Sequence, residues 1–203
     1  MIRIVDYGLG NMLAFLNVYK RLNIEAAVAK TADELRSATK IILPGVGSFD
    51  RAMELLEGSG MCPALNELVL TERVPVLGVC VGMQILARSS DEGRAAGLGW
   101  IGAHVSSFKS MQQEQLMLPH MGWNDVRPSN GCKLFRELET DARFYFLHSY
   151  YLRCDREEDV AAISNYGEDF CCAVSSGNIY GVQFHPEKGH HFGTQLLKNF
   201  AEL

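Results

Sequence analysis

The 203-residue chain has 47% hydrophobic and 21% charged residues, which is typical of an ordinary globular protein, so we expect one domain over residues 1–203. Its net charge of -5, without a Lys/Arg cluster longer than a pair, argues against nucleic acid as a partner. No stretch approaches the roughly 20 apolar residues of a membrane span, and the N-terminus lacks a signal-peptide pattern, so we expect a cytoplasmic protein with no membrane partner.

The first part of the chain alternates short apolar runs with amphipathic segments. The apolar runs predict strands at residues 2–5, 24–28, 40–43 and 74–79. Between them we predict a helix capped by Asn11, a short helix after the Thr31/Glu34 capping box, and helices over 49–56, from Pro63 to Leu70, and over 83–88. Because parallel neighbours need a crossover connection, this alternation predicts a parallel sheet flanked by helices.

After Gly97 the pattern changes to strand-like runs separated by short polar or Gly/Asn-rich segments. These runs lie at residues 100–108, 118–126, 142–152, 160–167, 170–178 and 179–184. They favour antiparallel or mixed pairing, and a closing helix has apolar residues from Phe192 to Phe200 at helical spacing. We therefore predict an α/β fold with a flavodoxin-like, mainly parallel central sheet, flanking helices and an added mixed β region.

The stretch G-V-C-V-G at residues 78–82 places Cys80 between two glycines where a strand enters a tight turn. This pattern parallels a nucleophile elbow, in which glycines let the nucleophile stand clear of neighbouring backbone. The start of the following helix would favour the thiolate, the form in which cysteine attacks. A packing role for Cys80 explains this stretch alone equally well. The other five cysteines have no metal-type spacing, so we expect free thiols and no metal site.

A second pattern, I-Y-G-V-Q-F-H-P-E at residues 179–187, places His185 and Glu187 two positions apart. In an extended segment held by Pro186, both side chains point to one side, where the carboxylate can fix the imidazole tautomer. Alone, such a pair is more often structural, but together with Cys80 it favours a catalytic triad. The loop P-G-V-G at residues 44–47 has backbone N–H groups suited to an oxyanion, although a plain strand-to-helix turn also explains it.

Together, G-V-C-V-G-M-Q, G-V-Q-F-H-P-E and P-G-V-G-S-F resemble the class I, triad-type glutamine amidotransferases, with matches spread over residues 6–191. Within that family, D-Y-G-L-G-N, P-G-V-G-S-F-D, P-H-M-G-W-N and F-L-H-S-Y-Y most resemble the glutaminase subunits of imidazole glycerol phosphate synthases, from histidine biosynthesis. The resemblance implies hydrolysis of L-glutamine to glutamate and ammonia without a cofactor.

The resemblance also implies a role for individual residues. Cys80 is the expected nucleophile, His185 the general acid and base, and Glu187 the residue that orients His185. The expected oxyanion hole is the loop Gly45, Val46 and Gly47 after a backbone rearrangement. The residues expected to hold glutamine are Gln84, Glu92 at its α-amino group, and the main chain of Ser149 and Tyr150 at its carboxylate.

The ammonia needs a recipient, because no part of the chain is left over to bind an acceptor substrate. In the family that partner is a separate (β/α)8-barrel cyclase subunit, so we expect a heterodimer with weak glutaminase activity in isolation. Trp123, Tyr150 and Lys188 are candidates for the partner interface, with core packing an equal alternative for Trp123. The histidines at 120, 148, 190 and 191 are expected to be structural or interface residues rather than metal ligands.

Several alternatives stay open at this point. Gly189 stands where the family usually has serine, and NIYGVQFHPEKGHHFG resembles a paralogous group that supplies ammonia for amidination of a surface-polysaccharide sugar. The destination of the ammonia is therefore open. A cysteine hydrolase of γ-glutamyl or peptide bonds could use the same triad, and an inactive regulatory binding module would instead predict a broken one.

Overall fold

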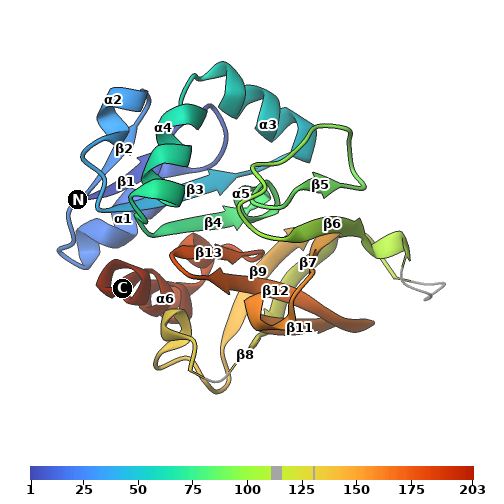
Figure 1. The fold of residues 1–203 in the computed structure, drawn as a ribbon. Coiled ribbons are helices and arrows are strands. Elements are labelled where there is room, and N and C mark those ends of the chain that lie inside the picture. Colours follow the sequence, from blue (N-terminus) through green and yellow to red (C-terminus); the bar gives the residue numbers. More distant parts are fainter. Residues whose placement is uncertain (111–115, 130) are drawn as a thin grey trace.

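The computed structural model describes residues 1–110, 116–129 and 131–203, and its centre is a twisted sheet with helices on both faces (Figure 1). Five strands of this sheet are parallel, in the order β2-β1-β3-β4-β13. They are β1 (Ile2–Val5), β2 (Ala26–Ala29), β3 (Lys40–Gly45), β4 (Val76–Cys80) and β13 (Ile179–Val182). This is the flavodoxin-like order, so the predicted fold class is confirmed.

The helices connect the parallel strands and cover both faces of the sheet. They are α1 (Met12–Arg21), α2 (Ala32–Leu35), α3 (Phe49–Gly58), α4 (Cys62–Asn66) with the π-helical η1 (Glu67–Thr71), α5 (Val81–Gln84) and α6 (His190–Glu202). Figure 1 shows α1 and α6 on one face and α2, α3 and α4 on the other. Within the described residues, none of these helices is long and apolar enough to cross a membrane.

Beyond β13 the sheet becomes mainly antiparallel. It continues through β12 (Glu168–Ser176), β10 (Tyr150–Cys154), β6 (Ala103–Ser107) and β5 (Ser89–Ser90), with β11 (Val160–Tyr166) and β8 (Arg127–Pro128) off that path. A separate two-stranded sheet pairs β7 (His120–Asp125) with β9 (Arg143–His148). Short 3-10 turns are η2 (Phe108–Ser110), η3 (Lys133–Phe135), η4 (Glu157–Asp159) and η5 (Pro186–Lys188). The predicted mixed β region is therefore present.

Two predicted boundaries are wrong in ways that bear on the site. The helix expected over residues 83–88 is instead α5, Val81–Gln84. Residues 98–101 donate hydrogen bonds to the carbonyl groups that a longer helix would need. The amides of Leu98, Ile101 and Gly99 donate to the carbonyls of residues 85, 86 and 87. The single run expected over 142–152 is split at Ser149 into β9 and β10, which belong to different sheets.

The core explains why the parallel strands are apolar over nearly their whole length. Helices cover both faces, so successive side chains are buried in either direction. Ile41, Ile42 and Leu43 of β3 are all fully buried, as are Val76 and Leu77 of β4. The carboxyl ends of neighbouring parallel strands then lie at one edge, where the loops after β3, β4 and β13 meet.

Candidate active site

Cys80 ends β4 in a backbone conformation that is unusual for a residue with a side chain. Its φ is 56° and its ψ is -116°, which is a strained combination. A Cβ on Gly82 would lie 1.9 Å from the Leu43 carbonyl oxygen, and one on Gly78 would lie 2.6 Å from the Gly82 carbonyl oxygen. The two glycines therefore allow backbone contacts that hold the turn at Cys80, as a nucleophile elbow requires.

The loop after β3 packs directly against this elbow. A Cβ on Gly45 would lie 2.5 Å from the Gly82 amide nitrogen, and the Tyr7 hydroxyl donates to the Pro44 carbonyl at 2.7 Å. In contrast, Gly47 has a φ of 88° with nothing within 4 Å of an added Cβ, and Val46 is 42% exposed. The loop is thus held at Gly45 and open at Val46 and Gly47, where the predicted backbone rearrangement has room.

His185 follows β13 and lies beside Glu187 in the predicted pair. The His185 Nδ1 atom is 2.8 Å from the Glu187 Oε1 atom, and both side chains are almost fully buried. The sequence predicts an extended segment between them, but Pro186 begins the 3-10 turn η5, and the Glu187 carboxylate lies against Nδ1 of the ring. The contact was thus predicted correctly and its backbone was not.

The electrostatics of His185 favour a charged ring. Burial is the largest influence and lowers the pKa of His185, but hydrogen bonds with Cys80 and Glu187 outweigh it and raise the pKa to about 9. Because Nδ1 bonds Glu187, the other ring nitrogen is left for the sulfur of Cys80. Protonated His185 can thus stabilise a thiolate and donate a proton to a leaving group.

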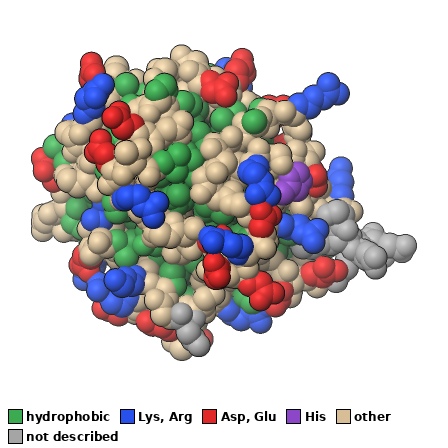
Figure 2. All heavy atoms as spheres, in the orientation of Figure 1, with side chains coloured by type: hydrophobic (Ala, Val, Ile, Leu, Met, Phe, Trp, Pro, Cys, Tyr) green, Lys and Arg blue, Asp and Glu red, His purple; other side chains and the backbone are tan. Residues whose placement is uncertain are grey.

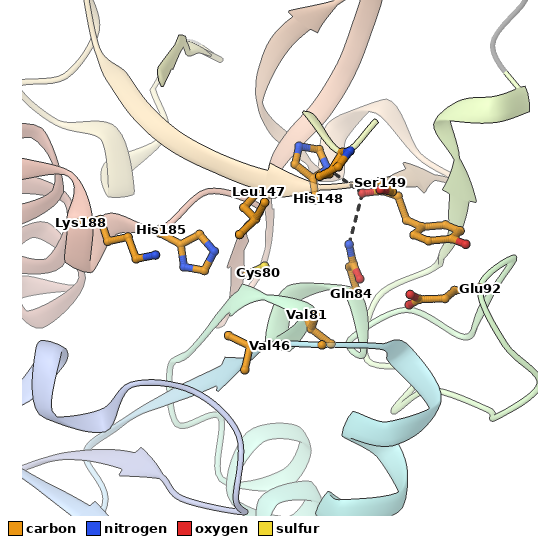
Figure 3. Close-up of a pocket in the computed structure, with 13 residues that line it drawn as sticks. Val46, Cys80, Val81, Gln84, Glu92, Leu147, His148, Ser149, His185 and Lys188 are labelled. Atoms are coloured by element: carbon orange, nitrogen blue, oxygen red, sulfur yellow. Dashed lines mark hydrogen bonds between the residues drawn. The ribbon is translucent and has the colours of Figure 1, made fainter. Parts of the chain in front are cut away.

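A cavity of about 320 Å³ opens above the elbow. Eight of the residues predicted for the site line it: Cys80, His185, Val46, Gly47, Gln84, Glu92, Ser149 and Tyr150. Lys188, predicted at the partner interface, also lines it, whereas Gly45, Glu187 and Trp123 do not. In Figure 3, His185 and Lys188 lie on one side of Cys80, and Gln84 and Glu92 lie on the other. The cavity is open to solvent and suits a small polar ligand.

Two polar side chains on the cavity wall are held in place by the protein. Glu92 Oε2 accepts the Phe49 amide at the start of α3 at 2.8 Å, so its carboxylate is fixed where it can receive an ammonium group. Gln84 donates from Nε2 to the Tyr150 carbonyl at 3.2 Å and to Gln183 Oε1 at 2.9 Å. Because both amide hydrogens are used, Gln84 has only Oε1 to offer a ligand.

Gln183 is the site residue that the sequence interpretation missed. It is fully buried, and its Nε2 atom lies 3.8 Å from the sulfur of Cys80. The available signal was a glutamine within the otherwise apolar run I-Y-G-V-Q-F. A polar side chain in a buried strand needs a partner, and its distance of 103 positions from Cys80 hid which partner it has.

Large apolar side chains are exposed on the small β7–β9 sheet next to the cavity. Met121 is 65% exposed, Trp123 42% and Leu147 40%, and Leu147 also lines the cavity. The Trp123 ring stacks on His190 with centroids 5.3 Å apart, and Lys188 Nζ lies 5.2 Å from the Tyr145 ring centroid. Trp123 is therefore on the surface rather than in the core. On the face shown in Figure 2, acidic and basic side chains are interspersed without a broad basic patch.

The unusual Gly189 has a steric explanation at the same surface. A Cβ on Gly189 would lie 2.8 Å from the Gly193 Cα atom and 3.1 Å from the Pro186 carbonyl oxygen. A serine in this backbone would collide with the first turn of α6. Glycine lets η5 run directly into α6 and leaves His190 against Trp123.

Comparison with known proteins gives one consistent result. The family described as "Glutamine amidotransferase class-I" matches residues 4–203. "Imidazole glycerol phosphate synthase subunit HisH" of Bdellovibrio bacteriovorus is 59% identical over 204 residues, and the protein of that name from Leptospira interrogans is 54% identical, with all of both chains covered in each case. A crystal structure titled "glutamine amidotransferase" has the same fold, with a TM-score of 0.74 at 20% identity over 99% of this chain and 97% of that one.

Proposed function

Because the chain belongs to the class I glutamine amidotransferase family, we propose that it is the glutaminase subunit of an imidazole glycerol phosphate synthase. It hydrolyses L-glutamine to glutamate and ammonia and passes the ammonia to a cyclase subunit in histidine biosynthesis. The observation behind the chemistry is the meeting of Cys80, His185 and Glu187 at one cavity wall. The pathway rests on the 59% identity, over the full length of both chains, with the HisH subunit of B. bacteriovorus.

In the proposed reaction, the Cys80 thiolate attacks the side-chain carbonyl carbon of glutamine. The resulting oxyanion binds backbone N–H groups of the Val46 and Gly47 loop. Protonated His185 gives its proton to the amide nitrogen as the C–N bond breaks, which releases ammonia and leaves a glutamyl thioester on Cys80. His185 then takes a proton from water, which attacks the thioester and frees glutamate and the sulfur.

The cavity offers complementary groups for both ends of the amino acid. We assign the fixed Glu92 carboxylate to the α-ammonium group of glutamine. The α-carboxylate binds the main chain at Ser149 and Tyr150, which line the same cavity. Gln84 contributes its Oε1 atom as an acceptor, since its amide hydrogens are already bonded. These contacts favour a substrate whose α-ammonium and α-carboxylate groups are both free, as in glutamine, over a glutamine residue within a peptide or protein.

The cyclase subunit, which we expect to be a (β/α)8 barrel, covers the mouth of the cavity. Exposed Met121, Trp123 and Leu147 form an apolar surface beside that mouth, and Lys188 lies at its rim. Such a cover keeps ammonia from bulk water and from protonation. We place the heterodimer in the cytoplasm, which suits six free cysteines.

The test is complementation of a histidine auxotroph that lacks this subunit, with the cyclase gene of the same organism supplied in all strains. We expect the wild-type chain to restore growth without histidine and Cys80→Ser not to. Failure of the wild-type chain, together with glutamate release from glutamine in vitro, would favour the surface-sugar pathway. Cleavage of γ-glutamyl peptides with no action on glutamine would favour the hydrolase alternative.

A further inference from the structure

Gln183 is a fully buried polar side chain whose two ends have different partners. It follows β13, two residues before His185. Its Oε1 atom accepts from Gln84 Nε2 at 2.9 Å, and its Nε2 atom lies 3.8 Å from the Cys80 sulfur. A buried amide without such contacts would lose its hydration without compensation. Gln183 is thus held by hydrogen bonds between the glutamine-binding residue Gln84 and the nucleophile.

The direction of these hydrogen bonds follows from the Tyr150 carbonyl oxygen, which has no hydrogen to donate. The Tyr150 carbonyl oxygen can only accept, so the Gln84 atom at 3.2 Å from it must be the NH2 group. That NH2 group also faces Gln183, which must therefore present its oxygen to Gln84. The Gln183 NH2 group is then left facing Cys80. A reversed Gln84 amide would place its oxygen against the Tyr150 oxygen, and a reversed Gln183 amide would place two NH2 groups together.

A second chain of hydrogen bonds, through His148, His120 and Asn124, leads to the same Tyr150 carbonyl. His148 Nδ1 lies 2.7 Å from the Tyr150 oxygen and must donate to it, so its Nε2 accepts from His120 Nδ1 at 3.0 Å. His120 Nε2 in turn accepts from Asn124 Nδ2 at 3.1 Å. Burial lowers the pKa of His148 to about 3 and of His120 to about 4, so the neutral tautomers that this pattern needs persist at neutral pH. The Tyr150 oxygen thus accepts two hydrogen bonds, one from Gln84 and one from His148.

We propose that Gln183 is a second sulfur-binding residue, whose side-chain N–H donates to the Cys80 thiolate and orients it for attack on glutamine. The inference rests on the proposed role of Cys80 as nucleophile. An amide neither gains nor loses a proton near neutral pH, so Gln183 is a constant donor while His185 moves the proton. Gln84 links this donor to the main chain of Tyr150, so the sulfur and the substrate-binding wall share one hydrogen-bond network.

The test measures the rate of Cys80 alkylation by iodoacetamide from pH 5 to pH 10 in the full chain, located by mass mapping. The variants are Gln183→Met, which keeps length without a donor, and Gln183→Glu, which keeps shape. In Gln183→Met, loss of one hydrogen bond to a charged group raises the midpoint of the alkylation profile by about one pH unit. At a pH below both midpoints the alkylation rate and kcat then fall about tenfold, while KM for glutamine stays within about twofold.

A matched control is Gln195→Met on α6, where the Gln195 amide bonds Asn199 at 2.9 Å outside the cavity. We expect its alkylation profile and kcat to equal the wild type. The other titratable groups around Cys80 are kept in every variant, and Gln183→Glu adds one carboxyl group. They are Tyr7, Glu92, His148, Tyr150, His185, Glu187 and Lys188. A Gln183 variant that unfolds is identified by circular dichroism, and the other variant then provides the measurement.

The outcomes separate this inference from the proposed function. An unchanged midpoint in a folded Gln183 variant overturns the role of Gln183, and so does a uniform loss of rate at every pH, which indicates damaged packing. Full glutaminase activity in Cys80→Ser would overturn the proposed function instead. A midpoint shift confined to the Gln183 variants supports the inference.

Discussion

Glu187 acts on the reaction only through His185, with Oε1 at 2.8 Å from Nδ1. Glu187→Gln keeps the shape of this contact and removes the negative charge. We expect the His185 pKa to fall from about 9, and kcat to drop on the order of 10⁴-fold, as in a comparable triad. NMR titration of the ring and steady-state glutaminase assays with the partner measure both effects. Unchanged values of pKa and kcat would remove Glu187 from the triad.

The neutral pair His120 and His148 makes the free energy of unfolding fall as the pH falls, whereas His185 makes it fall as the pH rises. Both have folded pKa values well below 6.5, so the unfolded chain binds more protons, and their contribution is lost as pH falls from 6.5 towards 3. His185 has a raised pKa, so its contribution is present below pH 6.5 and is lost as pH rises through about 9. We predict that His120→Gln flattens the acid side of the stability profile.

Urea unfolding between pH 4 and pH 7 measures this difference. The wild-type free energy of unfolding should fall with decreasing pH more steeply than that of His120→Gln, by up to about 1.4 kcal/mol per pH unit. At pH 7 and above the two slopes should agree. Identical slopes at acid pH would mean that His120 is not neutral in the folded protein.

The roles of individual residues could be predicted from the sequence where their partners are near in the chain or belong to a recognisable motif. His185 and Glu187 are two positions apart, and the glycines beside Cys80 indicate an elbow. Gln183 could not be assigned, because its partners Gln84 and Cys80 are about 100 positions away. Its burial next to Cys80 depends on the pairing of β13 with β4, which is a long-range contact.

Among the elements, the β4–α5 elbow depends on glycines that no other residue can replace. Gly82→Ala would place a methyl group 1.9 Å from the Leu43 carbonyl oxygen. We predict that this costs about 3 kcal/mol of stability, because two backbone segments must separate. Glutaminase activity should be lost with it, since Cys80 is displaced. Thermal and urea unfolding provide the measurement.

The matched control is Gly58→Ala at the end of α3, where an added Cβ meets nothing within 4 Å. Alanine should raise stability there by up to about 1 kcal/mol, because it restricts the unfolded chain. Equal effects of the two substitutions would contradict the steric account of the elbow.

Helix and strand positions could be predicted where local pattern and packing agree. The apolar face and Asn11 cap of α1 are local, and the Asn11 side chain accepts the Ala14 amide as expected. The end of α5 is set by amides of residues 97–101, which bond the carbonyls after it. No pattern in the neighbouring sequence indicates that long-range bonding. The break at Ser149, which places β9 and β10 in different sheets, also has no such pattern.

For the whole molecule, the exposed apolar surface on β7 and β9 predicts where the cyclase binds. Trp123→Ala should weaken the heterodimer at least tenfold, since a half-exposed aromatic at an interface centre often contributes more than 1.4 kcal/mol. The basal glutaminase activity of the isolated chain should remain, because Trp123 does not line the cavity. Isothermal titration calorimetry measures the affinity.

Leu70→Ala serves as the control for this prediction. Leu70 is 46% exposed on η1, which leads into the amino end of β4 and so lies at the opposite edge of the sheet from Cys80. Its replacement should leave the affinity for the cyclase unchanged. A loss of affinity for Leu70→Ala but not for Trp123→Ala would place the interface on the other side of the molecule.

The parallel arrangement of β3, β4 and β13 brings three distant loops together, and the central claim is that Cys80 in that group attacks glutamine. The most direct test is acid quenching of the heterodimer during turnover, followed by mass spectrometry of the peptide that contains Cys80. We expect a glutamyl group on Cys80, lost at neutral pH and absent from Cys80→Ser, which releases no glutamate. Steady glutamate release with Cys80 unmodified, and equal activity in Cys80→Ser, would contradict it.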